Sequence, residues 1–342
     1  MKAKYSRDEK GWQKWLVRSW TMGQVRCHFL MRSVFFAIIL FVAALPGRGA
    51  EAAAAIAADS AVAASEAKPE GLPSASPEAF HIGAFPVTSS MLVTWIVALG
   101  LIVFAQLATR NMKQVPGGLQ NFWEWLVGGL YEFLEGILGA DLVKKTFWFF
   151  ATIFIFILFT NWFGLLPGVG TIGWGAATKD GFEVTRPLLR GGNADLNMTF
   201  AMSSVFMLLW LFWAVQCNGV GGFLLHIFGP KGDSTGFVKL MMIVIFFGVG
   251  CVEVLSIAFR PISLSFRLYG NIFAGENLLE VFSNIVQNPP WAKAVASALL
   301  PLPFYFMELL VGFVQALVFM LLTSVFTVLV CQHDEEEHPK AH

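Results

Sequence analysis

The segment Phe237–Phe282 combines the apolarity of a membrane helix with side chains that carry charge. Arg267 is the most constraining of them. A charged group at the centre of a membrane helix costs roughly 2.5–3.5 kcal/mol, and arginine cannot lose its proton to avoid that cost. The same segment also contains Glu253, Arg260, Asn271, Glu276 and Glu280. Because charged residues in a membrane segment usually have a functional reason, this segment predicts a path for ions or protons.

The whole chain is too apolar and too poor in charge for a soluble protein. Of its 342 residues, 56% are hydrophobic and 13% are charged, whereas soluble domains usually contain about 25% charged residues. The composition therefore predicts an integral membrane protein. The formal net charge is zero, which indicates neither a nucleic-acid partner nor an acidic substrate. The four cysteines are far apart and predict neither a disulfide framework nor a metal site.

The first part of the chain predicts export. Residues 1–50 begin with basic residues and continue into the apolar run Val34–Leu45, which is typical of a secretory signal peptide. An uncleaved membrane anchor is the alternative. Residues 51–85 are rich in Ala, Ser and Pro and predict a flexible external segment. A membrane domain over residues 86–333 and an acidic cytoplasmic tail over residues 334–342 would follow.

Apolar runs predict an all-α membrane protein with about five spans in the mature chain. A span needs about 20 residues, and the candidate segments are Met91–Leu107, Phe147–Leu166, Leu196–Val215, Phe237–Val286 and Trp291–Val330. The last two segments exceed that length and contain Pro261, Pro301 and Pro303. They are therefore expected to form a strongly tilted, kinked helical hairpin.

Basic residues set the expected orientation of these spans. Arg110 and Lys113 follow the first span, which places that end in the cytoplasm by the positive-inside rule. The mature N-terminus is then outside and the C-terminus is cytoplasmic. Residues 168–195 are expected to form an external loop and residues 218–236 a second loop. The phenylalanines of Phe147–Phe163 are most simply explained as lipid-facing bulk.

Leu119–Leu142 is expected to be an amphipathic helix on the cytoplasmic surface of the membrane. At 100° per residue, Leu126, Leu130, Phe133 and Ile137 fall on one face, and Glu124, Glu132 and Glu135 fall on the other. The alternative is an ordinary amphipathic helix that packs on a soluble partner.

Helical spacing places several polar residues of the fourth span on one stripe. Glu253, Ser256, Arg260, Ser263 and Asn271 lie within about 40° of Arg267, and Glu276 and Glu280 lie on roughly the opposite face. On the partner helix, Glu308 and Gln315 are seven residues apart and share a face. Such groups can simply join helices to one another, but two arginines with several carboxyl and amide groups favour an ion pathway.

The same residues resemble a known family. The run RPISLSFRLYGNIFAGE, Arg260–Glu276, is similar to the signature of subunit a of the rotary F-type ATP synthase. Four other segments match that family in the same order, namely Ser89–Phe122, Thr160–Gly168, Ala194–Ala201 and Val311–Phe326. The resemblance covers about residues 80–333.

What this resemblance implies is a proton-channel stator in the membrane Fo sector, with no catalytic site, cofactor or metal. Arg267 corresponds to the arginine that faces the carboxylate of the c-subunit ring, and Asn271 and Gln315 to polar neighbours. Glu276 and Glu308 correspond to the outer half-channel, and Glu253 and Ser263 to the cytoplasmic one. The implied partners are the c ring, the b-subunit stator stalk, other synthase subunits and the bilayer of a bacterial inner membrane.

One departure from the family pattern concerns the outer half-channel. Many family members place a histidine beside its carboxylate, but none of the six histidines lies in the hairpin. A carboxyl pair that shares a proton through water is a possible substitute.

Two other functional interpretations compete with this one. The first is a secondary transporter, although no internal repeat is visible. The second is an intramembrane enzyme, although no HExxH or P-loop motif is present. The choice between proton and sodium stays open.

Overall fold

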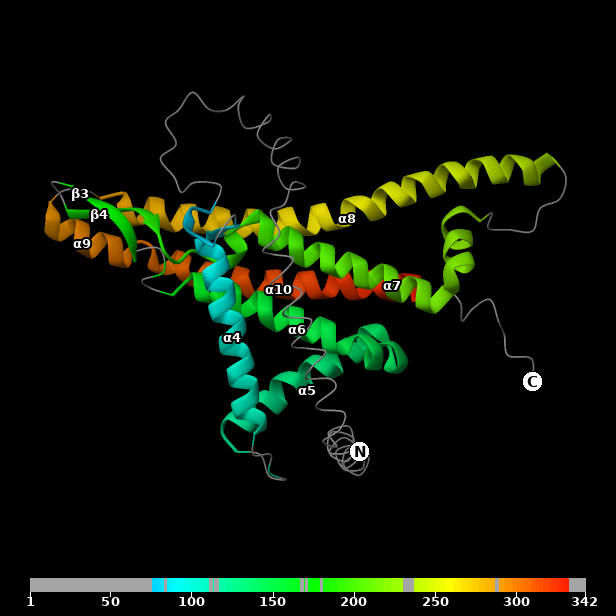
Figure 1. The fold of residues 1–342 in the computed structure, drawn as a ribbon, viewed down its shortest axis with the longest axis horizontal. Helices are drawn as coiled ribbons and strands as arrows, with labels where there is room; N and C mark the ends of the chain where they lie inside the picture. Colours follow the sequence, from blue (N-terminus) through cyan, green and yellow to red (C-terminus); the bar gives the residue numbers. More distant parts are fainter. Residues whose placement is uncertain are drawn as a thin grey trace. The chain divides into compact units, whose positions relative to one another are not determined.

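The computed structural model describes residues 76–82, 85–110, 117–166, 172–178, 181–229, 237–286 and 289–331, together with residues 113 and 169. The predicted signal segment, most of the predicted flexible segment and the acidic tail lie outside these residues. In the part that is described, the chain is mostly helical (Figure 1).

Five helical segments of the described chain are long and apolar enough to cross a membrane, as the sequence predicts. They are Ser89–Thr109, Ala140–Gly164, Leu196–Leu225, Val244–Ser283 and Val295–Cys331. The helices that contain them are α4 (Ser89–Thr109), α6 (Ala140–Gly164), α7 (Leu196–Phe228), α8 (Phe237–Asn284), α9 (Pro290–Leu299) and α10 (Leu302–Cys331).

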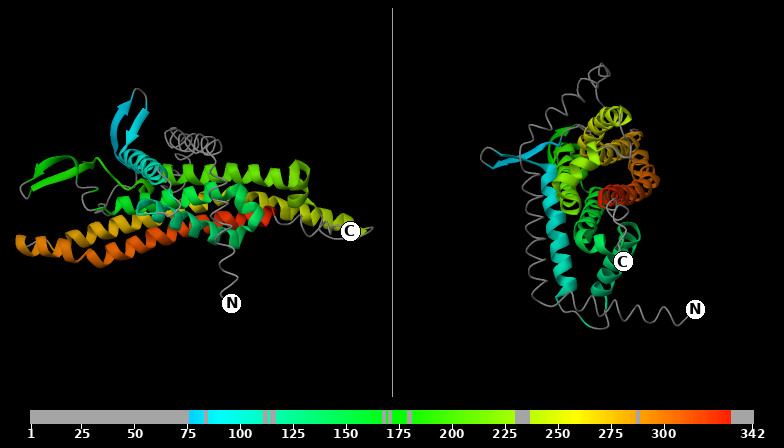
Figure 2. Two further views of the ribbon diagram at one scale, coloured as in Figure 1. Left: turned by 90° about the horizontal axis from the view of Figure 1, so that it is seen from below. Right: turned by 90° about the vertical axis from the view of Figure 1, so that its right-hand side faces the viewer.

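The last two spans form the predicted hairpin, with the break placed by proline. Helix α8 continues through Pro261 without ending, whereas Pro301 separates α9 from α10. A proline lacks the amide hydrogen that an internal helical position needs, so a helix commonly stops or bends there. Helix α10 packs along α8 (Figure 2), and the rings of Phe282 and Phe304 stack between them at 4.0 Å.

Helix α5 (Leu119–Leu138) confirms the predicted amphipathic helix but ends four residues early. Gly139 has a φ of 77°, a conformation that glycine adopts without steric cost, and α6 begins at the next residue. The face that α5 packs within the chain includes Leu130, Tyr131 and Leu134. The predicted apolar face shares Leu130 with this packed face but is centred about a quarter turn away, and its Phe133 is 43% exposed.

Helix α7 corrects the predicted loop over residues 218–236. The helix continues to Phe228, and only Gly219 leaves the helical conformation, with a φ of 68°. The second half of α7 packs against α8. Gly250 of α8 has no side chain, which leaves room for the ring of Phe228. The glycine-rich sequence therefore produces a break in a helix where a loop was expected.

Two short hairpins replace parts of the predicted external loops. Strands β1 (Glu78–Ile82) and β2 (Phe85–Thr88) pair in an antiparallel hairpin, so Glu78–Ile82, near the end of the predicted flexible segment, form a strand. Strands β3 (Gly173–Thr178) and β4 (Gly181–Pro187) form a second hairpin, followed by the 3₁₀ turn η1 (Gly192–Ala194). Ser89 Oγ donates to the Pro187 carbonyl oxygen at 2.6 Å, which ties the start of α4 to the end of β4.

Aromatic side chains form the core between α6, α7 and α10. Phe149, Phe150 and Phe156 of α6 are almost fully buried, so the prediction that these phenylalanines face lipid is wrong. The Phe149 ring lies 5.7 Å from the Trp213 ring of α7, and Trp210 Nε1 donates to the Phe326 carbonyl oxygen of α10 at 3.0 Å. Helical periodicity alone does not say which side of an all-apolar helix faces protein.

The cysteines also differ from their prediction. Cys217 of α7 and Cys331 at the end of α10 are joined by a disulfide, although 114 residues separate them in sequence. Cys251 is free and exposed. Sequence spacing could not reveal the bond, because the two residues meet only when α7 packs along α10.

Candidate functional site

Helix α8 presents a polar stripe on an exposed and otherwise apolar face. Only 6% of the residues in the most apolar stretch of α8 are buried within the chain. Ser256, Ser263, Arg267 and Asn271 are exposed and are called the α8 stripe below. Large apolar side chains flank the stripe, namely Val252, Leu255, Phe259 and Phe266, with exposed fractions of 36–67%. A large apolar face of this kind is typical of contact with another protein or with lipid.

Gln315 joins α10 to α8 at the level of Arg267. Its Nε2 donates to the Arg267 backbone carbonyl oxygen at 3.1 Å, and its side chain is buried. The bond therefore fixes the position of the backbone at Arg267 and leaves the guanidinium group on the exposed face. Gln315 and Glu308 are both buried on α10, which confirms that they share a face.

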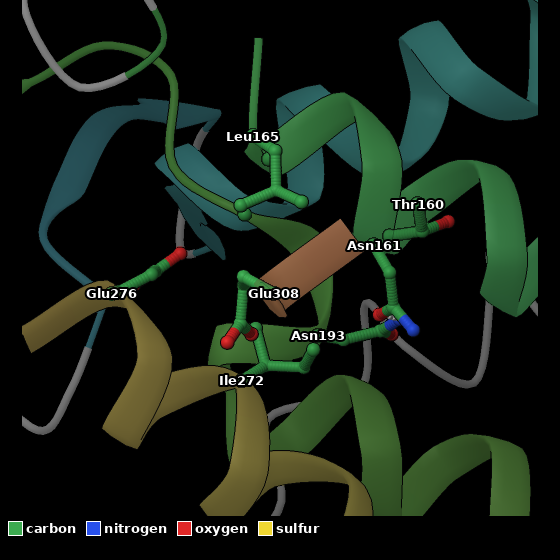
Figure 3. Close-up of a pocket in the computed structure, with 9 residues that line it drawn as sticks. Thr160, Asn161, Leu165, Asn193, Ile272, Glu276 and Glu308 are labelled. Atoms are coloured by element: carbon green, nitrogen blue, oxygen red, sulfur yellow. Dashed lines mark hydrogen bonds between the residues drawn. The ribbon is translucent and has the colours of Figure 1, made fainter. Parts of the chain in front are cut away.

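On the opposite side of α8, Glu276 faces Glu308 across a small cavity. The cavity has a volume of about 10 Å³, which is room for about one water molecule. It is called the carboxyl cavity here, and Figure 3 shows it. The residues that line it with the two carboxyl groups are Thr160, Asn161, Gly164, Leu165, Gly191, Asn193 and Ile272.

Two glycines make space for these carboxyl groups. A Cβ atom at Gly275 would overlap the Glu308 carboxyl group, and a Cβ atom at Gly191 would come within 2.5 Å of Glu276 Oε1. Gly275 is therefore the reason that Glu308 can approach α8 so closely.

A buried arginine supplies a positive charge beside Glu276. Arg190, in the connection between β4 and η1, places its Nε 3.4 Å from Glu276 Oε2. The exposed side-chain fractions are 4% for Arg190 and 17% for Glu276. The guanidinium group also lies 5.9 Å from the centre of the Phe273 ring, a cation–π contact. Sequence reasoning missed Arg190 because it lies in a segment that was expected to be an external loop.

Two asparagines close the other side of the carboxyl cavity, where their side chains meet (Figure 3). Asn161 Nδ2 donates to the Gly312 carbonyl oxygen at 2.9 Å, and Asn193 Nδ2 donates to Asn161 Oδ1 at 2.6 Å. Among the described residues, Asn193 Oδ1 and Glu308 Oε1 are buried without a hydrogen-bond partner. Buried acceptors that line a cavity of this size are suited to a bound water.

Asp195 begins α7 close to this site. Its Oδ1 accepts from the Asn197 backbone amide at 2.9 Å, the usual N-cap arrangement. Burial raises the pKa of the Asp195 carboxyl group above its usual value, against the opposing effects of these hydrogen bonds and of Arg190. Asp195 therefore belongs electrostatically to the surroundings of Arg190 while it caps its own helix.

Arg260 does not contribute its charge to the exposed α8 stripe. Its guanidinium group lies 4.5 Å from the centre of the Phe326 ring and 5.4 Å from that of the Trp210 ring. Both contacts are of the cation–π type. Glu253, one of the predicted channel residues, interacts electrostatically with Arg260. The structure thus separates the predicted polar residues into the α8 stripe, the carboxyl cavity and this aromatic contact.

The comparison with known proteins decides the family. Residues 91–328 match the family model described as the ATP synthase A chain. The chain belongs to this family. A relative named ATP synthase subunit a 3, from Pelobacter propionicus, is 34% identical over 68% of this chain and 83% of its own length. ATP synthase subunit a of Desulforamulus reducens is 30% identical over 76% of this chain and 86% of its own length.

The relative from Gloeobacter violaceus, also named ATP synthase subunit a, is 29% identical over 73% of this chain and 86% of its own length. Family membership and the five candidate spans make the chain a multi-pass membrane component of the ATP synthase. It is a non-catalytic component in a family that serves proton transport and ATP synthesis. The transporter and intramembrane-enzyme interpretations therefore give way to the resemblance found in the sequence.

Proposed function

We propose that this chain is the stator channel of the F-type ATP synthase, with two aqueous half-channels that lead to the carboxylates of a c-subunit ring. The observation that carries the proposal is the division of α8 into two sides. One side presents Arg267 on an exposed apolar face. The other side places Glu276 in the carboxyl cavity with Glu308.

The exposed face of α8 suits a ring of helices better than it suits lipid alone. An isolated charge that faces hydrocarbon is costly, whereas a carboxylate on a neighbouring subunit would pair with Arg267. A ring carboxyl group can turn through lipid only in its protonated form. When it reaches Arg267, the fixed positive charge favours its ionised form, and the proton is released.

The two half-channels are separated along α8. Glu253 lies fourteen residues before Arg267 and Glu276 nine residues after it, which correspond to about 21 Å and about 14 Å of helix. Neither distance permits direct proton transfer. We assign Glu276 and Glu308 to the outer half-channel, and Glu253 and Ser263 to the cytoplasmic one. Arg267 lies between them and repels protons, so the ring must turn to connect them.

The coupling follows from the charge that crosses the membrane. Each elementary charge that crosses 100 mV releases about 2.3 kcal/mol, and several such steps in one turn can drive phosphate chemistry elsewhere in the complex. In this proposal Asn271 and Gln315 position the arginine against the ring. The b-subunit stalk and other synthase subunits hold the chain still while the ring rotates.

We further propose that the chain lies in a bacterial inner membrane. The mature N-terminus would be outside and the C-terminus cytoplasmic, as Arg110 and Lys113 indicate. Residues 1–50 would direct export, residues 86–333 would form the membrane domain, and residues 334–342 would be a solvated tail. Helix α5 would lie at the cytoplasmic surface, where its exposed Trp125 and Phe133 would meet lipid headgroups.

The test is replacement of Arg267 by alanine in the whole synthase complex. Assembly would be checked by blue-native electrophoresis, and ATP-driven acidification would be followed in inverted membrane vesicles. We expect pumping to be lost while passive proton leak, measured after removal of the catalytic head, is kept or raised. Arg110→Ala, which removes an exposed charge at the end of α4, is the control. Normal pumping by the assembled Arg267→Ala complex would overturn the proposal.

A further inference from the structure

Three ionisable groups from distant parts of the sequence meet at the carboxyl cavity. Glu276 comes from α8 and Glu308 from α10, and Arg190 comes from the connection after β4. The two carboxyl groups and the guanidinium group are all largely or fully removed from solvent within the chain. Their charges must therefore be balanced locally.

This charge balance fixes the number of protons that the two carboxyl groups hold. Arginine keeps its positive charge even when buried, so Arg190 can compensate one ionised carboxyl group. Two neighbouring carboxyl groups do not both ionise readily in a buried site, because like charges repel each other. With one cation and two carboxyl groups, the neutral state of the site contains one proton.

We propose that Arg190 is the fixed counter-charge of the Glu276–Glu308 pair and limits the pair to a single exchangeable proton. The inference rests on the proposed channel function. Arg190 thereby supplies a positive charge beside a carboxyl pair in a hairpin that has no histidine. The proton moves from the carboxyl group of Glu308 to a water in the cavity, and that water gives a proton to the ionised Glu276. Glu308 gains the negative charge that Glu276 loses, and Arg190 keeps its charge throughout.

The surroundings hold Arg190 in place. Its neighbour Gly191 packs so closely that its Cα would lie 3.2 Å from a Cβ atom at Gly164 of α6. Next to it, a Cβ atom at Gly192 would come within 2.7 Å of Thr160 Cγ2. The ring of Phe273 lies against the guanidinium group. Because the two residues that follow Arg190 pack closely against α6, Arg190 is a stationary charge, unlike a lysine or arginine on a free loop.

Two other carboxyl groups interact electrostatically with Arg190 or Glu276 and must be considered in any pH experiment. Asp195 interacts with Arg190 electrostatically, but it also accepts from the amide of Asn197 at the positive end of α7. Glu280 lies one turn beyond Glu276 on α8 and acts on the same carboxyl group. The Tyr269 hydroxyl group also feels Arg190, Asp195 and Glu276. An Arg190 variant therefore removes the positive charge that lies 3.4 Å from Glu276.

The experiment compares Arg190→Gln, Arg190→Lys and Arg190→His in the full synthase complex, with Arg110→Gln as the control for loss of an exposed charge. Initial rates of ATP-driven pumping into inverted vesicles would be measured over a series of lumenal pH values, because the lumen corresponds to the outer face. We expect Arg190→Gln to pump roughly tenfold or more slowly and Arg190→Lys to keep most of the rate.

Arg190→His separates a charge from a structural anchor. Histidine loses its charge near neutral pH, so pumping should approach the lysine variant in acidic lumenal buffer and fall toward the glutamine variant in alkaline buffer. An anchoring role would give a reduced rate with the wild-type pH profile. That result, or equal losses in the lysine and glutamine variants, would overturn the inference. The histidine and lysine variants keep this test valid if the glutamine variant does not assemble.

Arg267→Ala is measured in parallel so that the two proposals can fail separately. Loss of pumping in Arg267→Ala, together with wild-type rates in Arg190→Gln at every pH, would remove only the role of Arg190. Normal pumping in Arg267→Ala would remove the channel function on which the inference rests.

Discussion

The exposed α8 stripe contains Arg267 and the buried carboxyl cavity has Arg190 beside it, but the two charges are balanced in different ways. Arg190 is buried and has Glu276 at 3.4 Å within the same chain. Arg267 is exposed on an apolar face, and in the described part of the chain no carboxylate forms an ion pair with it. A charge that is balanced inside the chain completes a local site, whereas one left on an apolar face requires a partner.

The comparison predicts different tolerance to lysine. Arg267→Lys should reduce ATP-driven pumping by about tenfold or more, because lysine is easily neutralised in an apolar environment. Arg190→Lys should keep most of the rate, because Glu276 stabilises the ammonium charge at that site. Both variants would be assayed in inverted vesicles after assembly is confirmed. Equal losses in the two variants would show that the two arginines do not differ in this way.

Gly275 tests whether the close approach of the carboxyl groups matters. Gly275→Ala places a methyl group where the Glu308 carboxyl group lies, so we expect pumping to fall several-fold as Glu308 is displaced from the cavity. Gly248→Ala is the matched control on the same helix, because nothing lies within 4 Å of a Cβ atom there. Wild-type pumping by both variants would mean that the position of Glu308 is not critical.

Asn161 tests the stability of the cavity wall. Asn161→Leu would remove the bond to Gly312 O and leave Asn193 Nδ2 without its acceptor. Loss of a partner to a buried polar group costs about 1–3 kcal/mol, so thermal unfolding of the purified complex in detergent should begin at a lower temperature. Thr152→Val removes only a bond to the preceding turn of α6 and should change the unfolding temperature less.

The smallest effect on stability is expected at Asp195, and this effect should depend on pH. Burial raises the pKa of its carboxyl group in the folded chain, so the folded state binds the proton more tightly than the unfolded state. The favourable contribution of this proton is present below the unfolded pKa of about 3.9 and is lost as pH rises through the higher folded pKa. Asp195→Asn keeps an N-cap acceptor and has no such loss.

The unfolding temperature of Asp195→Asn relative to wild type should therefore increase by a few degrees between about pH 4 and neutral pH. The measurement is thermal unfolding of the purified complex over that pH range. A constant difference would mean that the Asp195 carboxyl group has the same proton affinity in the folded and unfolded chains.

The sequence by itself determined the membrane class, the five spans, the hairpin and the family. Each of these depends on long apolar runs or on motifs that are local in sequence, such as Arg260–Glu276, and a bilayer imposes helices on such runs whatever their neighbours. Helical spacing also placed Glu276 on the side of α8 opposite Arg267, because a helix of known pitch assigns faces without reference to packing.

Only the tertiary structure decided which side chains contact one another. The partner of Glu276 is a residue 86 positions away, the disulfide joins residues 114 positions apart, and the phenylalanines of α6 are buried by α7 and α10. None of these pairings leaves a periodic signal, because they arise when helices and connections from different parts of the chain pack together. In the sequence, Arg190 is one basic residue of a predicted loop. Its role depends on packing, because Gly191 and Gly192 allow that loop to approach Glu276 and Thr160 closely.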